Sequence, residues 1–257
     1  MTTQLNGSVL KAFRILDLFA AGRSEMTAGE VAKDLKINLI TAHRFLHSLE
    51  QAGALRASAR GVFRLGYMFA DLGERVMRDG GPAPTLQPIL DNLARVTGEA
   101  CMATRFETDM AVCIAKAMPG RSLYVDIRIG SKLDAFCTAH GKLWLAFMVD
   151  EKREAYLATA RLSPLTATTI TGKSALKQEL DRIREDGFAL NDGERESDIY
   201  AIAVPITNRT GRMVCAISTF GTASSIVNQR STSLLHYLKD AARAAQNALY
   251  GTSSAGA

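Results

Sequence analysis

The sequence predicts an α+β protein of two domains joined by a helix. Three observations predict this: a break at residues 79–84, a helix-rich module with a short hairpin before it, and mixed strands and helices after it. The break reads Asp-Gly-Gly-Pro-Ala-Pro, which should stop one helix and resist an immediate restart of another. We therefore expect domains at residues 1–66 and 82–250, a linker helix at 67–81 and a disordered tail at 251–257.

The first domain should begin with three helices. Apolar residues at helical spacing predict the first, at Val9, Phe13, Leu16 and Phe19. Thr27 with Glu30 forms a capping-box pattern, which predicts a second helix over residues 28–35. Asn38 is suited to cap a third helix, and Gly53 stands where that helix should end in a left-handed residue. The buried stripe of this third helix should be Ala42, Phe45, Leu46 and Leu49.

A short hairpin should follow, with strands at 54–56 and 62–65 and a turn at 58–61. Helix, turn, helix and hairpin in this order are the elements of a winged DNA reader, whose third helix enters the major groove. The candidate DNA contacts are Thr41, Arg44, His47 and Ser48 on that helix, and Arg56, Arg60 and Arg64 on or beside the wing. Residues 31–66 hold six Lys and Arg against two Asp and Glu, which suits a phosphate-facing surface or a solvated basic face. Three helices with a hairpin also occur in protein-docking domains that bind no nucleic acid, so an adaptor is the alternative to a DNA reader.

The second domain should alternate between strands and helices. We expect strands at about 99–106, 110–117, 123–129, 200–206 and 213–220, with turns at 107–109 and 208–211. Helices are predicted around 86–97, 140–148, 151–159 and 176–186, and a long one should carry Leu234 to Leu249.

Composition excludes some classes of protein. No apolar run approaches the roughly 18 residues of a membrane helix, and the first residues lack the apolar region of a signal peptide, so we expect a cytoplasmic protein. The four cysteines (Cys101, Cys113, Cys137 and Cys215) are scattered, which favours reduced core thiols over disulfides.

An enzyme is the competing interpretation. Cys137 and His140 are three residues apart, and an imidazole is able to activate a thiol. No residue that would orient the histidine is evident, and His43, His47 and His236 are too scattered to complete a zinc site with the pair. No glycine-rich phosphate loop is present. We therefore expect no catalytic residues, no metal and no cofactor.

Five segments are informative together: SVLKAFRILDLFA, MTAGEVAKDLKINLITAHRFLHSLEQAGAL and GVFRLG in the first domain, and residues 130–148 and 186–221 in the second. In these segments, and over nearly its whole length, the chain resembles the IclR family of bacterial transcription factors. The resemblance implies a winged helix-turn-helix followed by a GAF-like domain that binds an effector. Leu39 and Ile40 depart from the family, which usually has polar or basic residues at the start of the third helix.

The resemblance also implies a ligand and an assembly. It implies double-stranded operator DNA as a partner, a homodimer or a dimer of dimers, and a small organic acid as the effector. The bulky residues Phe136, Tyr200 and Phe220 weakly favour an aromatic carboxylate, which the backbone amides before His140 could hold. The implied pocket wall is Cys137, Ala139, Asn191, Ala201, Ser218 and Phe220. From residue type alone, Cys137 and Phe220 also suit a packed core, and Ser218 could bond a neighbouring carbonyl.

Overall fold

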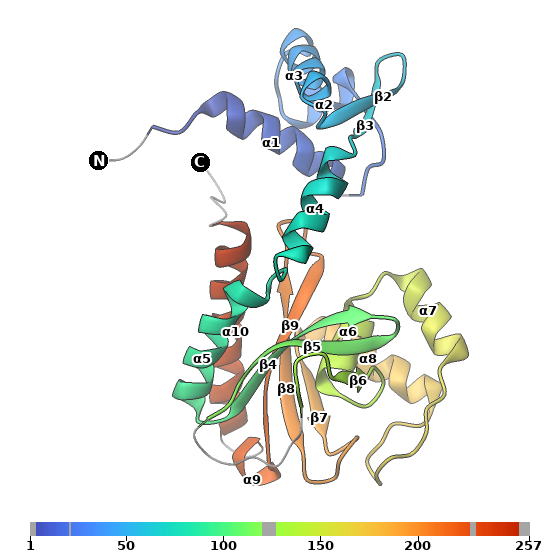
Figure 1. The fold of residues 1–257 in the computed structure, drawn as a ribbon. Coiled ribbons are helices and arrows are strands. Elements are labelled where there is room, and N and C mark those ends of the chain that lie inside the picture. The colour runs from blue at the N-terminus through green and yellow to red at the C-terminus, as the bar shows by residue number, and fades with distance from the viewer. Residues whose placement is uncertain (1–3, 21, 120–126, 227–229, 252–257) are drawn as a thin grey trace. The chain divides into compact units, whose positions relative to one another are not determined.

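The computed structural model describes residues 4–20, 22–119, 127–226 and 230–251. The chain divides into two compact units, Met1–Gly81 and the residues from Pro82 onward (Figure 1). Within the described residues, no helix is both long and apolar enough to cross a membrane. Of the disordered tail predicted at 251–257, residues 252–257 lie outside the described residues.

The first unit is a winged helix-turn-helix. Its helices are α1 (Gly7–Ala20), α2 (Ala28–Asp34) and α3 (Leu39–Gln51), and its wing is β2 (Leu55–Ala59) paired antiparallel with β3 (Val62–Leu65). The two local signals at the helix starts are confirmed: Thr27 and Glu30 form the capping box, and the Asn38 side chain accepts a hydrogen bond from the Thr41 amide. Gly53 has a φ of +76°, the left-handed conformation predicted for it.

The core of this unit joins all three helices to the wing. Ile15, Val31, Leu46 and Phe63 are buried together with Met26. Met26 belongs to β1 (Met26–Thr27), which pairs with β3 and makes the wing a three-stranded sheet. Strand β1 was not predicted, because two residues are too short to show a period.

Helix α4 (Met68–Arg78) follows the wing as predicted and has no buried residue in the isolated chain. The expectation that the prolines at the break would resist an immediate helix restart is wrong. Helix α5 (Ala83–Thr97) begins directly after Pro82, with Pro84 in its first turn. Proline is well suited there, because the first amides of a helix have no intrahelical acceptor.

The second unit is built on a six-stranded antiparallel sheet in the order β6-β5-β4-β9-β8-β7. The strands are β4 (Ala100–Glu107), β5 (Met110–Ala117), β6 (Lys132–Asp134), β7 (Ala189–Asp192), β8 (Tyr200–Thr207) and β9 (Met213–Gly221). Thr108 and Asp109 both have positive φ, the geometry of a tight turn between β4 and β5. The strand expected at 123–129 is corrected: residues 120–126 lie outside the described residues, 127–129 form no strand, and the third strand is β6.

Helices cover both faces of this sheet (Figure 1). Helix α5 and the long α10 (Arg230–Tyr250) pack on one face, over a core that includes Leu90, Ile217 and Leu238. Helices α6 (Ala139–Phe147) and α8 (Lys173–Asp186) pack on the other face, and α7 (Asp150–Thr159) adds Leu157 to that core. The short α9 (Ala223–Ile226) follows β9. Successive residues of each strand therefore face two different cores.

Candidate DNA-contacting surface and effector cavity

The outward face of α3 combines apolar and polar side chains. Leu39 and Ile40 are 56% and 75% exposed at its first turn. Together with His43, Arg44, His47 and Ser48 they line an open hollow on this surface. Thr41 is half-buried on the same helix. The start of the helix thus presents an apolar ridge beside a cationic and hydroxyl-bearing strip.

Some of the predicted DNA contacts are already engaged within the protein. His47 Nδ1 lies 3.0 Å from Glu50 Oε2, and the ring packs edge-on against Phe63 with centroids 5.6 Å apart. The Ser48 hydroxyl donates to the Arg44 carbonyl at 2.8 Å. Among the described residues, the Arg44 guanidinium has no ion-pair partner, so it is the cation on this face most available to an incoming phosphate or base.

The wing arginines occupy three different environments. Arg64 Nε donates to Glu25 Oε1 at 2.6 Å, and the hydroxyl of Ser58 and this guanidinium hold the pKa of Glu25 below its ordinary value. Arg56 lies opposite Arg64 across the two strands, with its guanidinium 5.5 Å from the ring centroid of Tyr67. Arg60 is exposed at the turn of the wing.

A cavity in the second unit lies between α6 and the sheet strands β4, β8 and β9. Its floor is made of buried residues: Met102, Leu133, Thr138, Ala139, His140, Asn191, Ala201 and Phe220. Its mouth is made of the partly exposed residues Ile127, Arg195, Glu196 and Ile199. The space open to the centre of a water-sized sphere is about 40 Å³, larger than the roughly 10–15 Å³ that one water needs. The cavity as it stands therefore has room for more than one water molecule.

Four of the six residues predicted for the pocket line this cavity: Ala139, Asn191, Ala201 and Phe220. The other two, Cys137 and Ser218, are fully buried in the packed core and do not belong to the lining. Arg195 and His140 line the cavity although the sequence analysis did not propose them as pocket residues. In the sequence, Arg195 is a single basic residue between two acidic ones, Glu194 and Glu196. This charge pattern is the one feature from which its role could have been predicted.

Ser218 acts on the cavity through His140. The His140 ring hydrogen-bonds Ser218 Oγ through Nε2 at 2.7 Å and Thr104 Oγ1 through Nδ1 at 2.9 Å. Trp144 Nε1 also lies 3.2 Å from the Thr104 hydroxyl. Burial lowers the pKa of His140 to about 3, because the charged imidazolium is poorly solvated there. The cavity floor therefore contains a neutral imidazole held in a fixed orientation.

The geometry does not support a Cys137–His140 nucleophile. Both ring nitrogens of His140 bond hydroxyl groups, and burial raises the pKa of Cys137 to about 12, so the reactive thiolate is absent near neutral pH. Within the described residues, no group of three or more His, Cys, Asp or Glu is placed to hold a metal ion.

The first turn of α6 forms one wall of the cavity. Thr138 caps this helix, accepting a hydrogen bond from the Gly141 amide at 3.0 Å and donating one to the Asp134 carbonyl at 2.7 Å. A Cβ at Gly141 would lie only 2.3 Å from Ala135 Cα, so glycine is required for this close approach. The tight packing places the amides of Ala139 and His140 at the helix start, beside the cavity.

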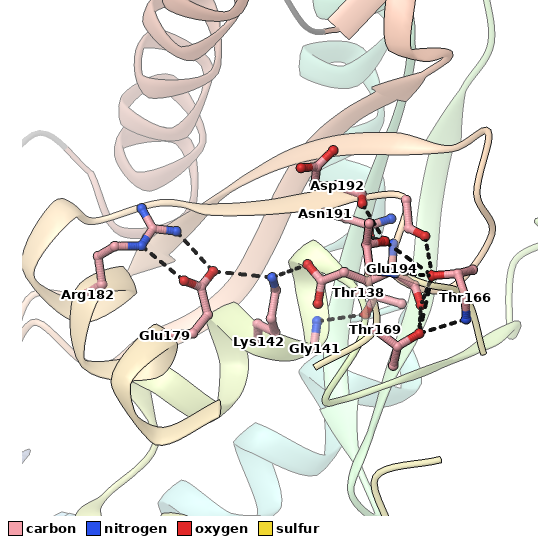
Figure 2. A network of polar contacts seen from close by, with 12 residues as sticks. Thr138, Gly141, Lys142, Thr166, Thr169, Glu179, Arg182, Asn191, Asp192 and Glu194 are labelled. Atoms are coloured by element: carbon pink, nitrogen blue, oxygen red, sulfur yellow. Dashed lines mark hydrogen bonds and ion pairs between the residues drawn. The ribbon is translucent and has the colours of Figure 1, made fainter. Parts of the chain in front are cut away.

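A buried ion-pair network connects α6 to α8 and to the loop after β7 (Figure 2). The Lys142 side chain is 2% exposed and pairs with Glu194 and, at 3.2 Å, with Glu179 of α8. The Glu194 carbonyl accepts hydrogen bonds from Thr166 and from Thr169, the latter at 2.6 Å. Burial raises the pKa of Glu194, so its carboxylate depends on the neighbouring ammonium group. The loop after β7 is thereby attached to α6.

Comparison with known proteins assigns each of the two units to a domain family. Residues 8–59 match the IclR helix-turn-helix domain, and residues 83–247 match the bacterial transcriptional regulator IclR C-terminal domain. The chain belongs to the IclR family. The match to both domains also identifies it as a transcriptional regulator with an effector-binding domain rather than an enzyme.

Relatives support this family at the level of the whole chain. The DNA-binding transcriptional repressor YiaJ of Escherichia coli is 31% identical over 217 residues, which is 83% of this chain and 77% of YiaJ. The Thermotoga maritima IclR crystal structure is 28% identical, with a TM-score of 0.64 over 95% of this chain and 99% of that one. An IclR homologue from Microbacterium hydrocarbonoxydans, solved with 4-hydroxybenzoate, shares the fold at 22% identity, with a TM-score of 0.60 over 95% and 99%.

Proposed function

We propose that this regulator binds its operator through α3 and the wing, and that a small organic acid in the cavity controls that binding. Leu39, Ile40 and Arg44 would enter the major groove, where the apolar pair suits the methyl groups of thymine. Arg56, Arg60 and Arg64 would contact phosphates beside it or enter the minor groove. The observation that carries the proposal is the exposed cationic and apolar face of α3 in a chain that also contains a mostly apolar cavity.

Within this class of ligand, we favour an aromatic carboxylate. Phe220, Met102 and Leu133 give the cavity apolar walls, and the start of α6 offers amide donors for a carboxylate. The Microbacterium homologue's 4-hydroxybenzoate supports this choice by analogy of fold. An aromatic ring needs more room than the cavity offers in this structure, so binding would require the partly exposed mouth residues to move.

We also propose that the protein acts as a homodimer or a dimer of dimers. Helix α4 exposes Leu72 and Val76, which are 53% and 60% exposed and could pair across a two-fold axis. Two recognition helices would then read half-sites about one helical turn apart, or a multiple of it. The effector would shift operator affinity only to the extent that it binds the two arrangements of the heads unequally.

A thermal-shift screen tests the effector half of the proposal. Purified protein is heated with a panel of short oxo-acids and aromatic carboxylates, each beside its neutral amide. A ligand of the folded state raises the unfolding midpoint by mass action. We expect a hit among the acids that disappears in Ala201→Leu, which fills the cavity, while the unliganded variant still unfolds cooperatively. A shift that survives in Ala201→Leu would assign the ligand to another site.

A salt titration tests the DNA half. We expect the protein to bind duplex from its own promoter region, with an affinity that falls steeply as salt rises, because phosphate contacts release counterions. Failure to bind any such duplex at low salt would contradict the proposal and favour a docking role for the basic face.

A further inference from the structure

The charge at the mouth of the cavity is carried by one ion-paired cluster. Arg195 Nε donates to Asp134 Oδ2 at 3.0 Å, and its Nη1 donates to Glu196 Oε1 at 3.1 Å. Among the described lining residues, Arg195 is the cationic side chain and Glu196 the anionic one, and His140 is neutral. Two carboxylates thus surround one guanidinium. An entering carboxylate meets a net negative cluster unless one of these partners is exchanged.

We propose that Arg195 selects a carboxylate effector by releasing Asp134 and pairing with the ligand instead. This inference rests on the proposed organic-acid function and assigns its charge recognition to a single side chain. A guanidinium presents a planar fork of donors that matches a carboxylate with two parallel hydrogen bonds. The mouth of the cavity brings that fork within reach of a ligand whose apolar part lies against the buried walls.

The existing pair is exchangeable. The Arg195 and Asp134 side chains are 35% and 34% exposed, and ion pairs at this level of exposure contribute little stability. The backbone beside Arg195 is held independently: the Glu194 amide donates to Asn191 Oδ1 at 2.9 Å, and the Gly193 carbonyl accepts from Thr166 Oγ1 at 2.7 Å. Only the arginine side chain needs to move, because the backbone on which it stands is already held in place.

The other polar groups of the cavity are neutral or already occupied. The Asn191 amide donates to the Ile199 carbonyl at 3.2 Å, and its oxygen accepts from Glu194. His140 uses both ring nitrogens. The amides at the start of α6 remain as donors, but neutral donors accept an alcohol or amide ligand as well as an acid. Discrimination by charge is therefore left to Arg195.

The test compares charged and neutral ligands of the same shape. Benzoate, 4-hydroxybenzoate and pyruvate are titrated into the full-length protein by calorimetry, with benzamide and 4-hydroxybenzamide as neutral counterparts. In Arg195→Gln we expect the acids to bind about ten- to hundredfold more weakly, because a charge-assisted hydrogen-bonded pair is lost. In Asp134→Asn we expect them to bind about two- to fivefold more tightly, because the competing carboxylate is gone. Neither variant should change the affinity of the amides.

Controls separate this role from general effects. Arg243→Gln removes the same charge from exposed α10, where Arg243 pairs with Asp240, and should leave acid affinity unchanged. Arg195→Lys keeps the charge but not the fork and should give an intermediate loss. Acid binding that is unchanged in both Arg195→Gln and Asp134→Asn overturns the inference alone. The absence of acid binding to the wild-type protein overturns the proposed function and this inference with it.

Discussion

Helix α3 and the cavity of the second unit present their polar groups in opposite ways. On α3, the Arg44 guanidinium has no ion-pair partner among the described residues, and two apolar side chains stand exposed beside it. In the cavity, His140, Asn191 and Arg195 are all bonded within the protein. If the proposed function holds, DNA binding at α3 would mostly add contacts, whereas binding of a carboxylate in the cavity would exchange the Arg195–Asp134 pair. Charge should therefore govern affinity at the first site and selectivity at the second.

The largest expected effect comes from breaking the buried ion pair of Lys142 and Glu194. Lys142→Met leaves Glu194 buried without its cation, so we expect the free energy of unfolding to fall by about 3–5 kcal/mol at pH 7. Urea unfolding followed by the fluorescence of Trp144, the single tryptophan, measures this. The matched control is Lys177→Met, whose pair with Glu154 is 45% and 55% exposed, and it should cost less than about 1 kcal/mol.

This penalty should shrink as the pH falls. Burial already raises the pKa of Glu194 in the folded protein, and loss of the Lys142 charge, which lowers it, will raise it further. Between the unfolded and folded pKa values the folded variant binds more protons, so its stability rises as the pH is lowered. Equal penalties at pH 5 and pH 8 would show that Glu194 is not the group left unpaired.

The local elements were predictable, but the cavity was only partly so. Thr27, Asn38 and Gly53 set helix ends through contacts within a few residues, so sequence alone located them. Arg195 lies in a loop, and its side chain is held at the cavity by a pair with Asp134, which is distant in sequence. The hydrophobic periodicity of a sequence gives no information about a contact of this kind. Cys137 was proposed through family resemblance, yet it packs into the core beside the lining.

His140 supplies the next largest effect, which appears as a pH dependence. Its pKa is lowered to about 3 by burial, against an ordinary value of 6.5. Between these values the unfolded chain binds one more proton, so stability is lost as the pH falls through this window, by up to about 1.4 kcal/mol per pH unit. His140→Gln removes this slope. We expect the difference in unfolding free energy between wild type and variant to narrow or reverse from pH 7 to pH 4, and a constant difference would contradict the assignment.

At the DNA surface, Arg44→Ala should weaken operator binding by about 1–3 kcal/mol. Titrations at several salt concentrations show which contact is lost. If Arg44 binds a phosphate, the slope of log affinity against log salt should become shallower by about one unit. If Arg44 instead contacts a base, the slope should be unchanged, and the variant should distinguish less well between operators that differ at that base. Arg23→Ala, at an arginine already paired with Asp34, is the control and should change affinity less.

Leu39 and Ile40 should contribute a smaller effect that depends on thymine methyl groups. Replacing half-site thymines by deoxyuridine removes only the methyl, and we expect about 1 kcal/mol of lost affinity at the contacted position. The double variant Leu39→Ser/Ile40→Ser should bind both duplexes equally, which ties the effect to these two side chains. A wild-type protein that does not distinguish the two duplexes would show that the apolar ridge lies outside the groove.

The smallest effect should be a gain in affinity at the wing. Glu25 holds Arg64 at 2.6 Å, much as Asp134 holds Arg195 at the cavity. Glu25→Gln frees Arg64 for a phosphate, so operator binding should strengthen by less than about 1 kcal/mol, with most of the gain lost at high salt. The double variant Glu25→Gln/Arg64→Gln should show no gain over Arg64→Gln. A gain that persists without Arg64 would instead reflect the removal of a repulsive charge near the DNA, and the parallel between the two arginines would fail.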